Sequence, residues 1–465
     1  MKKIILIFIL AVGFSGCSEL EHRLSTSIDA EEAIIDIPTL QSSVFGSYNT
    51  LQSSSLYNRN LLVIPELISE NAFIDAFDNT GRFLDFDNFN VINTNSEIFN
   101  IWLALGKIIS QTSYTIRKSR SLDVKDEEIN EKKHLTGEAH ALRALAYFIM
   151  QQYFCQPYNY TSDASHLGAP LPNFEVLGGI EIIYPARNST KEVFDQIISD
   201  LAKASALMSG YTDPSIDVYR LGLNGVNALL SRVYLSMENW QKADEFADKV
   251  LSGSYSLIGR DDYVDSWKYE FSSESIFSIY NDEIDNSITG SMYNFCLEYL
   301  DLFASPDFIN TFSDSDVRKD LYPLNTSLNV DVFTVNKFTS RFSNIPVIRL
   351  SEIYLIKAEA NANIPGKEVD AQNALFSIIQ RSDNTAIMPS EIGEALKDRI
   401  LLERRKELAF EGFRLFDLSR NKKSFVKYRQ EGTSINISTQ SDKTIMPIPA
   451  KEVNANTNMQ QNPGY

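Results

Sequence analysis

The stretch Arg399–Arg420 (RILLERRKELAFEGFRLFDLSR) constrains the fold more than any other part of the chain. Its apolar residues recur at helical spacing and predict one helix with a single apolar face, made of Leu401, Leu402, Leu408, Ala409, Gly412 and Phe413. Opposite charges at i,i+3 predict ion pairs along its flank: Glu403–Lys406, Arg404–Glu407, Glu411–Arg414 and Arg414–Asp417. Arg405 falls on the apolar stripe and is expected to have a buried or half-buried partner. No nucleophile, histidine or metal cluster accompanies these charges, so a structural helix is favoured over an acid/base site.

The composition of the 465-residue chain excludes one class of partner and suggests another. Its 43% hydrophobic and 22% charged content is ordinary for a globular protein, and the length allows one large core or two. The net charge of -18 is not offset by any basic run, so nucleic acid is not an expected partner. With 28 Phe and 21 Tyr but 3 Trp, many rings must lie outside the core, where they are candidates for ligand stacking.

The N-terminus predicts an exported, lipid-anchored protein. A basic start is followed by an apolar run, Ile4–Val12, that is too short to span a bilayer, and then by Gly13–Cys17, which resembles a lipobox. The acidic segment Ser18–Glu21 resembles the signal that sends some lipoproteins to the outer face of the outer membrane. The predicted organisation is a signal peptide (1–16), a lipidated Cys17 with a polar tether (17–35), and one domain (36–465).

The rest of the chain alternates between clean helices and irregular aromatic segments. Helical spacing of apolar residues predicts helices over 38–51, 97–118, 132–154, 193–208, 226–237, 243–251, 351–363 and 371–379. A capping box at Ser189–Glu192 starts one of them, and Tyr234, Trp240 and Ala243 follow the pattern of a tetratricopeptide (TPR) repeat. The predicted fold is mostly α, with about four TPR-like helix pairs and few short strands, one of them at 275–280.

Two long insertions, 54–95 and 253–346, interrupt these helix pairs. Both are rich in Asn, Asp, Ser and aromatic residues, and their periodicity fails, so long loops are expected. In repeat folds, insertions map to loops on one face, which is often the binding face.

Several motifs, taken in order, resemble the SusD/RagB family of outer-membrane nutrient-binding lipoproteins. They are GEAHALRALAYF (137–148), LLSRVYLSMENWQKADEFADKVL (229–251), RLSEIYLIKAEANA (349–362), ERRKELAFEGFRLFDLSR (403–420), IMPIP and QNPGY. The resemblance covers nearly the whole chain after the lipobox. It implies a helical fold with four TPR-like units, a loop-rich ligand face, an extracellular position, and a SusC-like TonB-dependent transporter as partner. It also implies capture of oligosaccharides, or of peptides in the RagB branch.

The insertions supply the side chains that a sugar needs. Aromatic rings suit its apolar C–H faces, and Asn, Asp and Arg suit its hydroxyls. The predicted ligand-binding residues are Phe77, Asp78, Asn79, Arg82 and Phe83 in the first insertion, with Phe73 nearby, and Trp267, Tyr280, Asn281 and Tyr293 in the second, with Asn294 nearby. Trp102 and Trp240 lie in predicted helices and are interpreted as structural. A face dominated by Phe and Tyr also suits peptides.

No catalytic, metal or cofactor site is predicted. HExxH, GxSxG, P-loop and GxGxxG motifs are absent from the sequence. Asp75, Asp78, Asp85 and Asp87 crowd one loop, but the glycine and glutamate of an EF-hand are not in place, so a solvated acidic loop is favoured. Cys155 and Cys296 remain either as a disulfide or as two buried thiols.

Glycan capture is therefore the first hypothesis, and three alternatives stay open. The first is a peptide-capture protein of the same fold. The second is a TPR-type assembly scaffold without a small ligand. The third is a surface hydrolase, since paired carboxylates from distant segments leave no sequence spacing to test.

Overall fold

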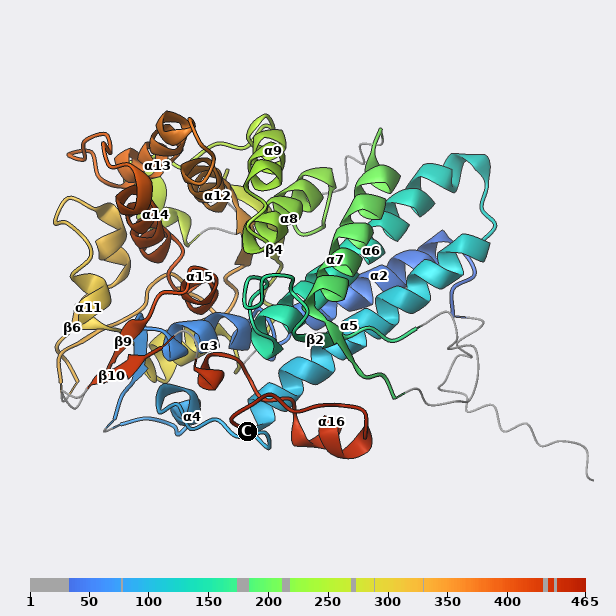
Figure 1. Ribbon diagram of the computed structural model, residues 1–465, viewed down its shortest axis with the longest axis horizontal. Coiled ribbons are helices and arrows are strands. Elements are labelled where there is room, and N and C mark those ends of the chain that lie inside the picture. Colours follow the sequence, from blue (N-terminus) through green and yellow to red (C-terminus); the bar gives the residue numbers. More distant parts are fainter. Residues whose placement is uncertain are drawn as a thin grey trace, which may run out of the picture.

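The computed structural model describes residues 33–76, 78–173, 184–210, 218–268, 273–287, 289–328, 330–429, 434–438 and 441–465. The predicted signal peptide, Cys17 and most of the tether lie outside these ranges. Four long helices gather at one end of the molecule (Figure 1): α2 (Ile37–Gln52), α5 (Ser96–Ser121), α6 (Ile129–Phe154) and α7 (Thr190–Met208). All four were predicted from periodicity, and the Ser189–Glu192 capping box at α7 is confirmed. Within the described ranges, no helix is both long and apolar enough to cross a bilayer.

The shorter helix pairs of the other half also form as predicted. They are α8 (Leu223–Ser236) with α9 (Trp240–Leu251), and α12 (Leu350–Ala362) with α13 (Glu368–Ser382). Small residues allow α8 and α9 to approach closely, and the buried Ser231 hydroxyl donates to the carbonyl of Ala243 at 2.9 Å. Arg232 on α8 binds Glu352 on α12 at 2.6 Å, so the two pairs are joined.

The stretch Arg399–Arg420 is not one helix, and that prediction is wrong. Its first part is the end of helix α14 (Gly393–Glu407), and its last part is a separate helix, α15 (Arg414–Arg420). The chain turns between them through two residues of positive φ, Phe410 (64°) and Gly412 (84°). A side chain at Gly412 would collide with the carbonyl oxygen of Leu61, so the turn is shaped by close approach to another segment.

The charges of this stretch also find partners elsewhere. Of the four predicted flank pairs, Glu403–Lys406 forms, at 3.7 Å. The other charged residues of those pairs bind side chains on other elements or on the far side of the turn, as when Asp417 accepts from Arg404 at 2.8 Å. Arg405 is 8% exposed and donates to the Asn71 side chain at 2.8 Å, so its predicted buried partner is confirmed.

The first insertion was predicted as loops, but it contains a buried helix. Helix α3 (Asn60–Ile68) is buried at every position, and β1 (Ala72–Ile74) and α4 (Leu84–Asp87) follow it. Because α3 is surrounded by protein on all sides, it has no apolar stripe for a periodicity argument to detect.

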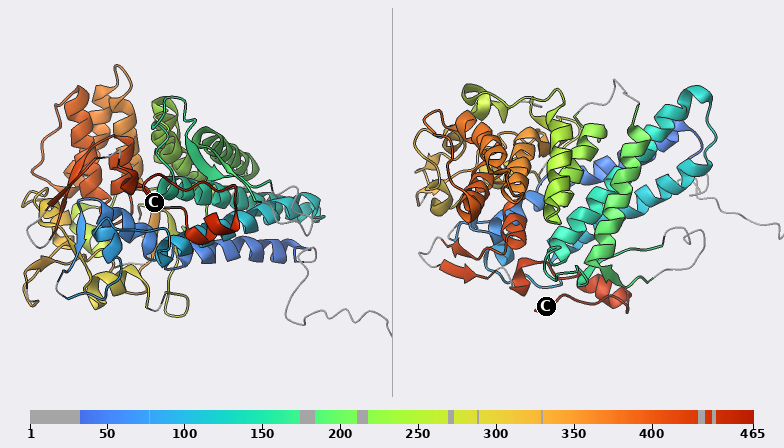
Figure 2. Two further views of the ribbon diagram at one scale, coloured as in Figure 1. Left: turned by 60° about the horizontal axis from the view of Figure 1, so that its bottom comes forward. Right: turned by 45° about the horizontal axis from the view of Figure 1, so that its top comes forward.

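The second insertion is a chain of short elements. They are η3 (Arg260–Asp262), α10 (Tyr263–Ser266), β4 (Ser275–Ile279), the π-helical η4 (Asn294–Glu298), β5 (Leu302–Ala304), α11 (Pro306–Ile309), η5 (Val317–Leu321), β6 (Leu324–Asn325), β7 (Val332–Phe333) and β8 (Ile345–Arg349). Strand β4, predicted at 275–280, pairs antiparallel with β8. The helices α8, α9 and α12–α14 stand on one side of a layer built by both insertions (Figure 2).

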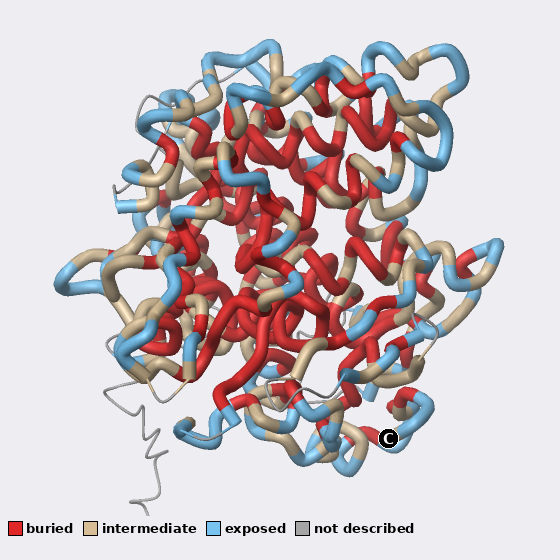
Figure 3. Tube along the Cα trace, turned by 90° about the vertical axis from the view of Figure 1, so that its left-hand side faces the viewer, coloured by how far each residue is buried: buried red, intermediate tan, exposed pale blue. Residues whose placement is uncertain are grey.

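The closing segments complete the structure. Strands β2 (Leu167–Pro170) and β3 (Arg187–Ser189) pair, as do β9 (Phe425–Tyr428) and β10 (Ser434–Ile437), and α16 (Ala450–Ala455) lies near the C-terminus. Figure 3 shows the buried chain enclosed by exposed connections. Cys155 and Cys296 are both buried free thiols, so they do not form the disulfide that the sequence left open.

Candidate ligand-binding face

The two insertions lie against each other and form one layer. Strand β1 of the first pairs antiparallel with β5 of the second, with Phe73 opposite Phe303, within the sheet order β1-β5-β7-β6. Asn58 and Asn281 exchange amide hydrogen bonds of 2.9 Å. Segments more than 200 residues apart in sequence are thus held in fixed positions by backbone and side-chain pairing.

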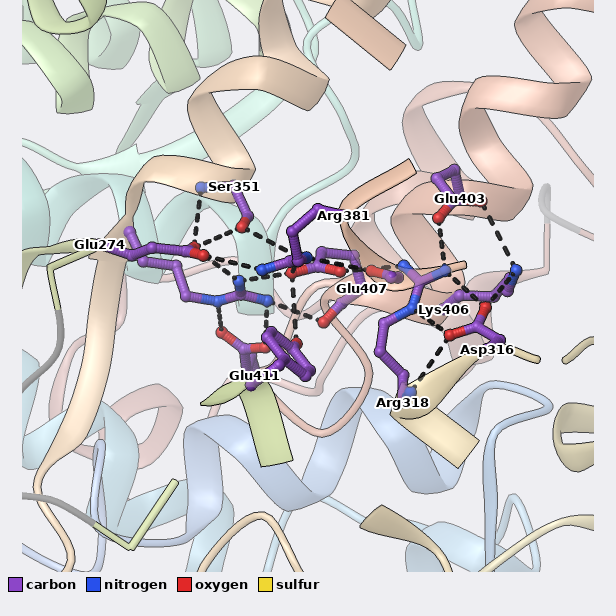
Figure 4. Close-up of polar contacts among 12 residues, drawn as sticks. Glu274, Asp316, Arg318, Ser351, Arg381, Glu403, Lys406, Glu407 and Glu411 are labelled. Atoms are coloured by element: carbon purple, nitrogen blue, oxygen red, sulfur yellow. Dashed lines mark hydrogen bonds and ion pairs between the residues drawn. The ribbon is translucent and has the colours of Figure 1, made fainter. Parts of the chain in front are cut away.

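A buried ionic network anchors this layer to α14 (Figure 4). Arg349 at the end of β8 binds Glu407 and Glu411, each at 2.7 Å. Arg318 of η5 binds Glu403 at 2.6 Å and Glu407 at 2.9 Å. The other members are Glu274, Asp316, Lys337, Arg381 and Lys406. All are buried, and the cationic and carboxylate members are equal in number, which buried charges require.

The same arginines keep the carboxylates ionised. Burial by itself raises the pKa of Glu407, but the charges of Arg381, Arg349 and Arg318 outweigh it and hold the pKa well below its usual range. Burial likewise opposes ionisation of Glu411, whose pKa Arg349 and Lys337 lower. Glu407 and Glu411 are therefore ionised at neutral pH.

An aromatic pair with one exposed and one half-buried ring lies where β4 ends. The Tyr280 side chain is 39% exposed, and its ring meets that of Tyr219 edge to face with centroids 4.9 Å apart. The Tyr280 hydroxyl donates to Asp282 at 2.9 Å, and the Tyr219 hydroxyl accepts from the Asn344 amide at 2.9 Å. Hydrogen bonds from backbone N–H groups and from Tyr280 lower the pKa of Asp282, so it presents a carboxylate.

A second group of exposed or half-buried side chains is linked to Asn344 through the chain and through side-chain contacts. Phe342, which is 37% exposed, and Arg341 lie just before Asn344 in the chain. The Arg341 guanidinium lies 3.2 Å from the Glu298 carboxylate on η4. Arg82 of the first insertion lies over the Tyr299 ring, 5.0 Å from its centroid. We call the surface formed by Arg82, Tyr219, Tyr280, Asp282, Glu298, Tyr299, Arg341, Phe342 and Asn344 the aromatic face.

The structure separates the predicted ligand-binding residues into two groups. Asp78, Arg82 and Tyr280 are exposed and Tyr293 is half-buried, so each has surface to offer. Four others make contacts within the protein: Phe83 packs on Phe295, and Asn281 is paired with Asn58. The half-buried Asn79 bonds within its own loop, and the ring centroid of the half-buried Trp267 lies 4.5 Å from the Lys337 ammonium. Phe77 is not among the described residues. Phe73 and Asn294, noted near them, are buried.

Sequence reasoning missed seven residues of the aromatic face: Tyr219, Asp282, Glu298, Tyr299, Arg341, Phe342 and Asn344. Tyr219 lies outside both insertions, just before α8, where nothing in its neighbourhood distinguishes it from a core aromatic. The other six lie in the second insertion, and only the folded chain selects them from its many aromatic, amide and charged side chains. Within the described ranges, no three His, Cys, Asp or Glu side chains gather as metal ligands.

Comparisons with known proteins agree with this architecture. A model described as "SusD family" matches residues 310–465, and one described as "Starch-binding associating with outer membrane" matches residues 26–235. The curated "SusD-like protein P2" of Formosa agariphila is 23% identical over all of both chains.

Solved structures align over most of the chain. A putative sugar binding protein from Bacteroides vulgatus is 28% identical, covers 93% of this chain and 99% of its own, and gives a TM-score of 0.82. A SusD superfamily protein from Bacteroides thetaiotaomicron is 26% identical, covers 92% and 100%, and also gives 0.82. The arrangement of helix pairs with a loop-rich layer is therefore the SusD-type fold of these solved structures. The chain belongs to the SusD/RagB family, and the resemblance drawn from its motifs is confirmed.

Proposed function

We propose that this protein captures glycans at the aromatic face and delivers them to a SusC-like TonB-dependent transporter. It acts without catalysis, anchored by lipid on Cys17 at the extracellular side of the outer membrane. The Tyr219–Tyr280 pair is the observation that carries the proposal, because an exposed ring packs on a half-buried one and polar side chains bond both hydroxyls.

The chemistry of this surface fits a saccharide. Ring faces and edges pack against sugar C–H groups, while Asp282, Asn344 and Arg341 supply acceptors and donors for hydroxyls. These side chains already hold one another in place, so binding costs little side-chain entropy. A match to a family model described as starch-binding, and a solved neighbour described as sugar binding, support the same ligand class.

Peptide capture is the second candidate, and one observation favours it. The single tryptophan of the insertions, Trp267, lies over Lys337 and Arg349 and is not part of the aromatic face. The remaining Tyr, Phe, Arg and Glu side chains also suit a peptide.

Calorimetry with residues 18–465, without the lipid, separates these candidates. The protein is titrated with polysaccharides, oligosaccharides and peptides, and any hit is repeated with Tyr280→Ala and Tyr219→Ala. Tyr160→Ala is the matched control, because Tyr160 is also exposed and meets His166 edge to face, but lies in the segment after α6. The proposal expects glycan binding that both face variants weaken by about tenfold or more and the control leaves unchanged.

Other outcomes have definite meanings. Binding of peptides alone would replace the glycan with a peptide ligand. Glycan binding insensitive to both face variants would refute this location, and cleavage of a bound glycan would refute the non-enzymatic role. The scaffold alternative would be favoured if no compound of the panel bound and a transporter still co-purified after the insertion loops were removed.

A further inference from the structure

A polar cleft of about 210 Å³ opens at a place that the aromatic face does not include. It lies where the α8–α9 turn, the end of α12, α14, the residues after α15 and the segment after α6 meet. Trp240, interpreted from sequence as structural, is half-buried; its ring packs on the main core and also lines this cleft.

Polar groups in the cleft have unused hydrogen-bonding capacity. The Asn159 amide nitrogen donates to Glu238 at 2.6 Å and to the Arg420 carbonyl at 2.8 Å, but its buried oxygen accepts from no described residue. Lys397 and Lys422 also line the cleft, and neither forms an ion pair with another described side chain. A buried acceptor without a donor is costly and is normally satisfied by water or by a ligand.

Two helix ends at this cleft carry charged residues where glycine is preferred. Glu238 (φ 56°) and Lys422 (φ 52°) each follow a helix end in the left-handed conformation. Both ends are complete Schellman motifs, since Glu238 N–H bonds Leu235 O and the next N–H bonds Tyr234 O, with the same pattern after α15. Glycine adopts this conformation without strain, whereas a residue with a side chain does not. The chain therefore keeps two charged side chains of opposite sign, both lining one cleft, at a cost in stability.

We propose that this cleft is a second ligand site, which takes one pyranose ring of a neutral saccharide. Trp240 supplies an aromatic surface for the C–H face, Glu238 supplies acceptors for hydroxyls, and Lys422 supplies donors. Acidic and basic side chains line the cleft in equal numbers, so a strongly charged ligand gains little there. Its volume lies below the roughly 300–1,000 Å³ of sites for drug-sized ligands, which suits a single ring. The saccharide class rests on the proposed function, but the separate location does not.

Glycine substitutions test the site without endangering the fold. Glu238→Gly and Lys422→Gly relieve the left-handed backbone, so their thermal unfolding midpoints should equal or exceed that of the native protein. Saturation-transfer NMR with the methyl glycosides of glucose, galactose and mannose is then run on the native protein, on both glycine variants, on Trp240→Ala and on Tyr280→Ala.

The expected result is a response to at least one glycoside that Tyr280→Ala retains. The Lys422→Gly and Glu238→Gly variants should remain folded and should bind that glycoside about tenfold more weakly. No response to any glycoside, or a response unchanged in both glycine variants, would overturn the proposal. A stronger response to an N-acetyl dipeptide amide than to every glycoside would overturn the saccharide class. Failure of the aromatic-face proposal would be recognised separately, by oligosaccharide binding that is insensitive to Tyr280→Ala.

Discussion

Glu407 is the carboxylate on which the buried ionic network depends most, and its neutralisation should be severe. It lies 2.9 Å from Arg318, 2.7 Å from Arg349 and 2.5 Å from Arg381. Glu407→Gln keeps the shape but removes the charge, so three buried guanidinium groups lose a shared counter-ion. Removing one partner of a buried ion pair costs about 3–5 kcal/mol, and we expect a loss of unfolding free energy in that range.

The assay is thermal and urea unfolding with a matched surface control. Unfolding entropy is about 2.1 cal/mol/K per residue, so for a chain of this length a loss of about 4 kcal/mol lowers the melting temperature by about 4 °C. Glu245→Gln is the control, because Glu245 also binds two cations, Lys242 and Lys249, but its side chain is 43% exposed. Exposed pairs contribute about 0–1 kcal/mol, so this variant should unfold almost as the native protein does.

The pH dependence gives a second check with a definite sign. The pKa of Glu407 in the folded protein lies well below its ordinary 4.5, so its stabilising contribution is complete above pH 4.5 and is lost as the pH falls below that value. The difference between native protein and Glu407→Gln should therefore be constant near neutral pH and shrink in acid. A Glu407→Gln variant that unfolds within about 1 kcal/mol of the Glu245→Gln variant would refute the view that the network stabilises this fold.

Further predictions concern backbone strain and a second buried charge. Gly412→Ala should destabilise the protein by about 1–3 kcal/mol or prevent folding, because φ is positive there and the new side chain would collide with the Leu61 carbonyl. Gly106→Ala lies in a helix with open space around it and should stabilise the protein by about 0.5–1 kcal/mol. Equal melting temperatures for the two variants would contradict this reasoning. Asp200 binds His140 and Arg143. Burial opposes ionisation of the Asp200 carboxyl, but these two partners outweigh burial and lower its pKa to about 2. The ionised Asp200 should contribute about 2 kcal/mol of stability above pH 3.8, and this contribution is lost as the pH falls towards 2. Asp200→Asn should therefore make stability depend less on pH in acid, and an unchanged dependence would argue against this role.

The ionic network also joins the loop layer to the helical scaffold. Glu274 precedes β4, Arg349 ends β8, and both bind partners on the helical scaffold. The aromatic pair at Tyr280 sits at the far end of β4 from Glu274, so its position follows from strands fixed at the buried end. Variants that break the network should therefore weaken ligand binding through loss of order at the aromatic face as well as through lost stability.

Local rules predicted the elements whose stability is local. Helices α2, α5, α6 and α7 follow apolar stripes, and the Ser189–Glu192 capping box marks the start of α7. These signals are clearest in α2, α5 and α7, which each bury one face and expose the other, whereas α6 is buried at most positions from His134 to Phe154. Where burial is complete, as in α3, the stripe disappears and sequence periodicity fails.

The sequence by itself determined the helical pairs, the two insertions and the family, because amphipathic spacing and ordered motifs are written along the chain. Tertiary structure alone decided which charges meet. Glu407 and Arg414 were predicted to bind neighbours on one helix, yet Glu407 binds arginines from three other elements and Arg414 binds Glu70. It also decided that Tyr219 meets Tyr280 while Trp267 covers buried cations. The physical reason is that ion pairing and ring packing depend on distance in space, and residues far apart in sequence become neighbours only when the core closes.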